Sequence, residues 1–548
     1  MSDESALSRR ALLGAGGLAG AALLGSSGIA PVRAASTPTG QVVSRAVLPS
    51  DRQGFNRRWF APNLQRVYIP RTSQDVAACL EQAVAREGRG VKVVSGRHCY
   101  EGFVYSDDAN AIIDMSALDH AGWDPEHQAY FIQAGCENWA GYRALLNSFG
   151  RTLPGGSCAS VGAGGHIAGG GYGLMSREHG LTIDHVTAVD IVTWDDARSR
   201  ATVRHISESS TDPDERDLFW AVRGAGGGNY GIITTFYFAD PPVAPAYASL
   251  WNIAWDWSDL TEARFSRLLS EYSQWVAEMP TRYFTLLKLN HSGSGQVSML
   301  LQMASEPDAS LNQHLAEVGD YVTSSQKTFA PVGKVARGQQ SVQHLTFLET
   351  VWTLSGNGPN QFGKYKSAYL NAAIAEDQVA AIYKWLRTTP DRIPAAQMGP
   401  SLVQIDSYGG AVNNVSPTAT ALPQRSALLK LQFQTYWNNA SRVGSLAPGW
   451  ETEQEQAHLS WMRNLYSDTF ASTGGTPNPA EDSRGIVGGC YYNYPDVDLG
   501  TNADGRIDEA LWLYFLDNYR NSPRNLVGVK QRWDPTNLFR HAQSIPTR

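Results

Sequence analysis

The amino-acid sequence predicts a mixed α+β fold with two domains, one of which is discontinuous in the chain. The chain has 548 residues, which is more than one hydrophobic core usually organises. Helical and strand patterns alternate through residues 46–243, and glycine runs lie in the loops between them. Two segments rich in proline and glycine, at 239–251 and 472–485, then divide the chain into three parts.

The elements of the first part can be assigned in order. A helix is predicted from Thr72 or Ser73, either of which can cap it, to Gly88. Another helix begins at Asp212 in capping-box fashion and leads into the glycine run 224–228. The remaining elements are strands at 91–94, 111–115, 129–135, 186–194 and 230–238 and an amphipathic helix at 138–150.

The simplest domain organisation joins the two outer parts of the chain. Residues 46–243 and 484–548 are expected to form one domain, closed by its C-terminal piece. Residues 244–483 are expected to form a second domain inserted into the first, and they are richer in Gln, Ser and aromatic residues.

Residues 1–35 are predicted to be a signal peptide. Arg9 and Arg10 precede an apolar stretch of small residues, and an A-x-A-like cleavage pattern ends at Ala35. The paired arginines indicate the twin-arginine route, which exports proteins already folded around a cofactor. Gly and Ser dilute the apolar stretch, which disfavours a membrane anchor. We therefore expect an exported bacterial protein with a bound prosthetic group.

The charge balance limits the kind of partner. The formal net charge is −7 and no block of Lys or Arg occurs, which argues against binding to nucleic acid or to an anionic membrane. A small, mostly neutral ligand is expected, with no membrane association after removal of the signal. Five cysteines without a C-x-x-C pair cannot form a disulfide framework; Cys79 is expected in the core of the first helix.

The glycine runs suggest a bound anion, because backbone without Cβ lets several N–H groups converge. A Rossmann site requires the order strand, glycines, helix, whereas the run 224–228 follows a helix and leads into a strand. A P-loop is excluded, since Tyr365 occupies the position of the required Ser or Thr. No Cys or His pair has zinc-like spacing and no G-x-S-x-G elbow occurs, so neither a metal site nor a hydrolase is predicted.

Six segments in order along the chain carry a resemblance to a known family. They are "SGRHCYEGF", "LPGGSCASVGAGGHIAGGGYG", "RGAGGGNYGIIT", "SYGG", "NYPDVDL" and "RWDPTNLFRH". The chain resembles the berberine-bridge-enzyme-like oxidases of the vanillyl-alcohol-oxidase superfamily over nearly all of residues 46–548. The resemblance implies a two-domain flavoprotein, in which 46–243 and 484–548 bind FAD and 244–483 form a substrate domain with an antiparallel sheet backed by helices.

The resemblance also implies that FAD is attached bicovalently, through His98 to the flavin 8α-methyl group and through Cys158 to ring carbon C6. A thiolate and a neutral imidazole are soft nucleophiles that can add to an electron-poor ring. Taken alone, His98 could equally be an ordinary loop histidine. The other positions that match cofactor contacts are Ser95, Gly96, Arg97, Gly162, Gly164, Gly165, His166, Gly170, Gly171, Gly228, Asn229, Gly231, Ile232 and Asn493.

Arg97 departs from the family pattern, which commonly has glycine at this position. If the backbone there requires a positive φ, Arg97 is strained. Either the loop differs slightly, or the guanidinium helps to hold the FAD phosphates.

Three tyrosines are the predicted catalytic residues. Tyr494 matches the family's base, Tyr408 a tyrosine that faces the substrate, and Tyr172 a supporting tyrosine. The base removes the hydroxyl proton while a hydride passes to flavin N5. Because a free phenol has a pKa of about 10, nearby positive or donor groups must lower the pKa of such a base. The alternative is that these are packing aromatics, since the chain has 23 tyrosines.

The predicted function is therefore oxidation of a hydroxyl group of a secondary metabolite, on a polyketide or its sugar, to a carbonyl group. O2 would reoxidise the flavin and give hydrogen peroxide, and the protein would act as a monomer or homodimer. A hexose or oligosaccharide oxidase of the same family is the first alternative. An exported carbohydrate-binding protein without catalytic activity, which would use the aromatic-rich middle part for stacking, is the second.

Overall fold

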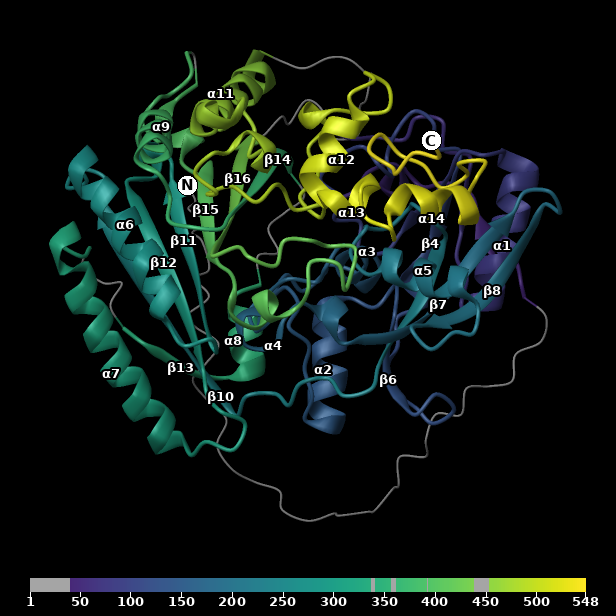
Figure 1. Cartoon of the computed structure of the whole chain (residues 1–548), viewed down its shortest axis with the longest axis horizontal. Coiled ribbons are helices and arrows are strands. Elements are labelled where there is room, and N and C mark those ends of the chain that lie inside the picture. The colour runs from purple at the N-terminus through teal and green to yellow at the C-terminus, as the bar shows by residue number, and fades with distance from the viewer. Residues whose placement is uncertain (1–39, 337–340, 356–360, 392, 438–452) are drawn as a thin grey trace, which may run out of the picture. The chain divides into compact units, whose positions relative to one another are not determined.

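The computed structural model describes residues 40–336, 341–355, 361–391, 393–437 and 453–548. These residues form three β-sheets with helices packed on them (Figure 1), so the prediction of a mixed α+β fold is confirmed. The predicted signal peptide lies outside the described residues. Within the described ranges, no helix has the length and apolar character that crossing a bilayer requires.

Two smaller sheets are built from the part of the chain before residue 240. In the four-stranded sheet, three strands run parallel and β1 pairs antiparallel at the edge; its order is β1 (Ser44–Arg45), β2 (Arg66–Tyr68), β4 (Ala111–Asp114) and β3 (Val91–Val94). The five-stranded sheet is antiparallel, in the order β5 (Ala121–Asp124), β6 (Ala129–Gln133), β9 (Ile232–Phe238), β7 (Val186–Asp195) and β8 (Arg200–Ser207). The sequence patterns had not indicated β5 and β8.

Helix α1 (Ser73–Glu87) contacts strands of both small sheets. It begins where predicted, because the Thr72 hydroxyl accepts a hydrogen bond from the backbone N–H of Asp75. It ends at Gly88, whose φ of 78° requires the left-handed region. Cys79 is fully buried in this core, as predicted.

The middle part of the chain forms a seven-stranded antiparallel sheet, on the left in Figure 1. Its order is β13 (Gln343–Thr346), β10 (Tyr247–Asp256), β12 (Gln296–Ala304), β11 (Tyr283–Asn290), β15 (Leu402–Ser407), β16 (Leu429–Trp437) and β14 (Phe362–Leu370). The long helices α6 (Glu262–Glu278), α7 (Leu311–Phe329), α9 (Glu376–Leu386) and α11 (Glu453–Thr469) back this sheet. The expected antiparallel sheet backed by helices is thus confirmed.

The glycine run 224–228 lies between α5 (Pro213–Val222) and β9, in the order that excludes a Rossmann site. The C-terminal helix α14 (Leu526–Trp533) packs on α5, so the end of the chain returns to its first part. The remaining helices are α2 (Asn138–Phe149), α3 (Ala163–Ala168), α4 (Ser176–His179), α8 (Phe347–Thr353), α10 (Ala395–Met398), α12 (Ile507–Phe515) and α13 (Asp517–Arg520).

Candidate active site

Two loops that are far apart in the sequence bring the predicted flavin-attachment residues together. His98 follows β3, and Cys158 lies in the loop before α3. The His98 Nε2 atom is 2.8 Å from the hydroxyl of Ser160, two residues after Cys158. Burial lowers the pKa of His98 to about 4. The imidazole is therefore neutral at physiological pH and keeps a lone pair for nucleophilic attack.

Glycine is required where these two loops touch. A Cβ atom on Gly96 would lie 2.2 Å from the backbone nitrogen of Gly162. A Cβ on Gly162 would lie 1.9 Å from the Ser95 hydroxyl, which itself donates to the carbonyl of Ala134. Any larger residue at either position would separate the loops and with them His98 and Cys158.

Arg97 adopts the left-handed conformation, with φ of 63°, so the position does require the backbone that glycine favours. The guanidinium forms an ion pair with Asp114 at 2.6 Å and lies 3.6 Å from Asp51. Both carboxylates are buried. This pairing offsets the backbone strain and ties the attachment loop to β4 and to the N-terminal segment.

Tyr494, the predicted base, is joined to a buried lysine that the sequence analysis did not identify. The ammonium of Lys430 donates to the Tyr494 hydroxyl at 3.1 Å and lies over its ring. Lys430 is fully buried on β16 and forms an ion pair at 3.0 Å with Asp406, its direct cross-strand neighbour on β15. Burial and the Asp406 charge raise the pKa of Tyr494, and the adjacent ammonium opposes this by favouring the phenolate.

The other two predicted tyrosines lie beside this group. The Lys430 ammonium is 4.2 Å from the centroid of the Tyr172 ring, and the Tyr172 hydroxyl donates to the backbone carbonyl of Ser407. Tyr408 packs on Tyr172 with ring centroids 5.2 Å apart. Its hydroxyl is fully buried and donates to a backbone carbonyl. Tyr172 thus contacts the lysine directly, whereas Tyr408 packs against Tyr172 and Tyr369.

The segment of His98 lies beside the tyrosine group. Tyr100, two residues after His98, has its ring centroid 5.7 Å from that of Tyr494. Tyr100 stacks on Tyr365 of β14 with ring centroids 3.7 Å apart. The structure therefore brings the two attachment residues and the predicted base to one site.

His166 and Asn493 connect the glycine-rich helix α3 to the segment of the base. The His166 Nε2 atom accepts from the backbone N–H of Gly156, and burial lowers the pKa of His166 to about 4. The Asn493 amide donates to the His166 carbonyl at 2.9 Å. Both side chains bond to protein groups and hold Tyr494 next to the loop of Cys158.

The predicted cofactor position Asn229 is hydrogen-bonded to the C-terminal segment of the chain. The Asn229 amide oxygen accepts from the backbone of Ile545, and its carbonyl accepts from Lys530. Ile232 is buried at the start of β9, and a Cβ on Gly231 would collide with the Val192 carbonyl. The remaining glycines, Gly164, Gly165, Gly170, Gly171 and Gly228, lie in or beside the glycine runs.

Comparisons with known proteins agree with this arrangement. Residues 64–201 match the model of an FAD binding domain, and residues 490–546 match the model described as berberine and berberine like. The hexose oxidase of Chondrus crispus is 35% identical over 529 residues, which cover 91% of this chain and 93% of that protein. The aclacinomycin-N/aclacinomycin-A oxidase of Streptomyces galilaeus is 33% identical, with 90% and 87% covered.

A solved structure has the same fold. It is the glycopeptide hexose oxidase DBV29 in complex with teicoplanin, with a TM-score of 0.78 and 32% identity, covering 93% of this chain and 100% of that one. These relatives are oxidases, and they contradict the alternative of a binding protein without catalytic activity.

Proposed function

Because this chain belongs to the berberine bridge enzyme-like family of FAD-linked oxidases, we propose that it oxidises a hexose hydroxyl on a secondary metabolite to a carbonyl group. The single observation that carries the proposal is the contact between Lys430 and Tyr494 at 3.1 Å, on the side where the His98 and Cys158 loops meet. The hexose and glycopeptide hexose oxidases among its relatives support a sugar as the oxidised unit.

The residues at the junction of the two loops fit a bicovalently held FAD. His98 is neutral and therefore nucleophilic, and a Cβ on Gly165 or Gly227 would have no neighbour within 4 Å, so the backbone beside both glycine runs is accessible. A bound FAD would supply the hydride acceptor for the substrate carbon and the route by which the electrons reach O2, with hydrogen peroxide as the product. Residues 46–243 and 484–548 would hold it, and 244–483 would cover the substrate.

The protein's own groups handle the proton. Tyr494 takes the proton of the substrate hydroxyl, and Lys430 favours the phenolate that makes this possible. Asp406 keeps the ammonium in place from the neighbouring strand. Because Lys430, Tyr172 and Tyr408 are buried, little water competes with the substrate hydroxyl for the base.

The first experiment asks whether the flavin is covalently attached. The protein is denatured in acid, and the yellow colour is followed to the polypeptide or to the supernatant. Retained colour is expected, and His98→Ala and Cys158→Ala should each keep the flavin through the other link, whereas the double variant should release it. Colour lost from the parent protein would overturn the proposal of covalent attachment.

The second experiment tests the substrate and the base. Peroxide release is measured with hexoses, oligosaccharides and glycosylated polyketides. Tyr494→Phe should abolish turnover. Tyr383→Phe on α9 should not, because the Tyr383 hydroxyl donates to the Leu260 carbonyl and accepts from Arg387. A free hexose as best substrate would favour the second candidate, a hexose oxidase, which the Chondrus crispus relative supports. Export by the twin-arginine route belongs to the same proposal and is tested by secretion of a fusion to residues 1–35.

A further inference from the structure

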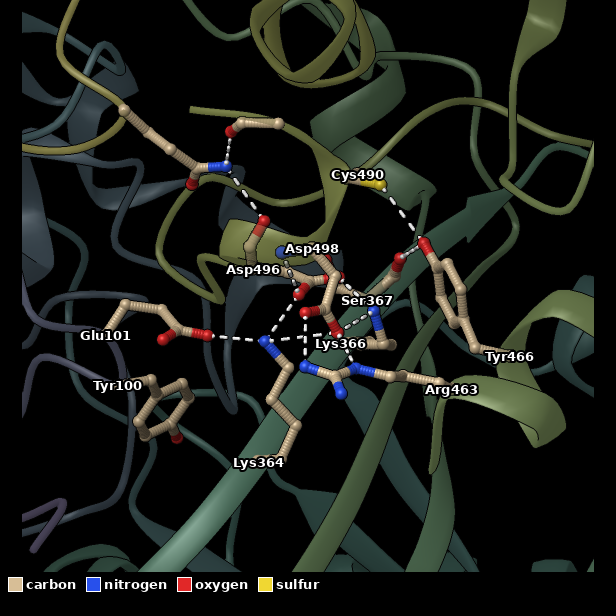
Figure 2. Close-up of polar contacts among 12 residues, drawn as sticks. Tyr100, Glu101, Lys364, Lys366, Ser367, Arg463, Tyr466, Cys490, Asp496 and Asp498 are labelled. Atoms are coloured by element: carbon tan, nitrogen blue, oxygen red, sulfur yellow. Dashed lines mark hydrogen bonds and ion pairs between the residues drawn. The ribbon is translucent and has the colours of Figure 1, made fainter. Parts of the chain in front are cut away.

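A network of six charged side chains lies behind the site, on the edge strand β14 (Figure 2). Two lysines of β14, Lys364 and Lys366, are at its centre. The remaining members come from three other segments and are Glu101, Asp496, Asp498 and Arg463. Three cations thus face three anions.

Lys364 joins two of these segments directly. Its ammonium is 2.7 Å from the Glu101 carboxylate and 2.6 Å from the Asp496 carboxylate. Lys366 binds the second oxygen of Asp496 at 2.6 Å. These four side chains are less than 5% exposed, whereas Arg463 at the far end of the network is 45% exposed. The shortest ion-pair distances are therefore those between the most buried side chains.

Stability alone does not explain this network. A buried ion pair is often no more stabilising than well-packed apolar residues of the same volume, because both charges lose their hydration. Burial alone would lower the pKa of Lys364, but Asp496 and Glu101 raise it above its usual value. Asp498, 3.5 Å from the same ammonium, acts in the same direction, so the carboxylates around Lys364 keep it charged and specify one arrangement.

The positions of the two carboxylates in the chain connect them to the chemistry. Glu101 lies three residues after His98, and Asp496 lies two residues after Tyr494. Alternation along β14 places Lys364 and Lys366 on one face of the sheet, where Lys366 contacts Tyr466 of α11, and Tyr365 on the other face, against Tyr100. Tyr100 and Tyr494 thus lie on the face of the sheet that bears Tyr365, whereas the side chains of Glu101 and Asp496 reach the opposite face, which bears Lys364 and Lys366.

We propose that Lys364 is a positioning residue that fixes the His98 segment, through Glu101, and the Tyr494 segment, through Asp496, against the same strand. This proposal rests on the proposed function. Attachment at His98 would replace a flavin C–H bond and the imidazole N–H bond with one C–N bond, and the two electrons and two protons released would pass to O2 to give hydrogen peroxide. The Cys158 loop is held separately, by Asn138 and by Ser355, so loss of Lys364 affects the two links unequally.

The test uses a double variant that keeps the charges balanced, Lys364→Met/Glu101→Gln. Peptide mapping by mass spectrometry then measures flavin at His98 and at Cys158 separately in the purified holoprotein. We expect attachment at His98 to fall about tenfold, less than the roughly hundredfold loss that a 1 Å misplacement of a reacting group can cause, with attachment at Cys158 retained. The single variant Glu101→Gln is isosteric and should also lower attachment at His98.

A second variant tests the base segment. Lys366→Met/Asp496→Asn should leave both flavin links intact and slow flavin reduction by substrate about tenfold to a hundredfold. The control is Lys384→Met/Asp468→Asn, which removes an exposed ion pair between α9 and α11 of the same domain and should change neither readout.

The outcomes separate this proposal from the proposed function. A parent protein without covalent flavin contradicts the proposed covalent attachment, and with it the effect of Lys364 on attachment at His98. A parent protein with both links, together with Glu101→Gln and the Lys364 double variant that melt at the parent temperature and carry full flavin at His98, overturns the positioning role. If the double variant does not fold, Glu101→Gln alone decides by the same criterion.

Discussion

Removal of Lys430 tests whether this lysine activates the base. At 3.1 Å from the Tyr494 oxygen, a unit charge stabilises a phenolate by about 5 kcal/mol with an effective dielectric constant of about 20. That corresponds to roughly four pKa units and is an upper limit, because the Asp406 carboxylate opposes it. We expect the loss of both charges to raise the pKa of Tyr494 by about one to two units.

The variant to use is Lys430→Met/Asp406→Asn. Lys430→Met alone would leave Asp406 buried without a counterion, at a cost of about 3–5 kcal/mol of folding stability. Flavin reduction is followed by rapid mixing of enzyme and substrate without oxygen, from neutral to alkaline pH. The rate should be about tenfold to a hundredfold lower at neutral pH, since one to two pKa units deplete the phenolate by that factor, and should recover as the pH rises.

The shape of the pH profile distinguishes activation of the base from damage to the fold. Misfolding lowers the rate at every pH and does not move the midpoint. If the double variant is slower but has the midpoint of the parent, Lys430 does not act on the Tyr494 proton and the reasoning is wrong. Unchanged flavin absorbance and melting temperature are the controls for intact structure.

Three further predictions concern stability and assembly. Burial raises the pKa of Glu178 from 4.5 to about 7. The folded state therefore holds a proton that the unfolded state loses, and the free energy of unfolding falls as the pH rises between these values. In thermal melts, Glu178→Gln should raise Tm by up to about 3 °C above pH 7 and should have no effect near pH 4.5. Arg97→Gly relieves the strain of the left-handed backbone but leaves the buried Asp114 carboxylate without its ion pair. Chemical denaturation should show a net loss of about 2 kcal/mol in the free energy of unfolding. An increase in that free energy would mean that the backbone strain costs more than the ion pair contributes. Gly162→Ala would place a Cβ 1.9 Å from the opposite loop and should abolish covalent flavin on denaturing gels, whereas Gly319→Ala, in open space, should not.

The features that the sequence predicted correctly depend on short-range signals. The cap at Thr72 and the stop at Gly88 involve residues within a few positions of the helix they bound. The glycine-dependent contact between the His98 and Cys158 loops could be inferred only through the family resemblance, because it joins segments about 60 residues apart. Local patterns determine elements, whereas the site depends on which elements meet.

Lys430 shows why part of the site escaped sequence analysis. The segment "LKLQFQTYW" of β16 alternates apolar and polar residues, a pattern typical of a strand with one face in water. In the structure both faces are covered, so Lys430 and Gln432 are buried. Polar residues kept on a covered face must find partners, and here the partners are Asp406 on the next strand and Tyr494 and Tyr100 from distant segments.

The same reasoning applies to "FGKYKSAYL" of β14, which pairs directly with β16. The alternation predicts that its lysines are exposed to solvent, yet each forms an ion pair with a carboxylate from another segment. When the alternation along a strand predicts that charged side chains are exposed but the structure buries them, those charges are candidates for a functional role. In the proposed mechanism the two adjacent strands have different roles. Lys430 acts on the face that bears the proposed base, Tyr494, and Lys364 on the opposite face fixes the segments of Tyr494 and His98.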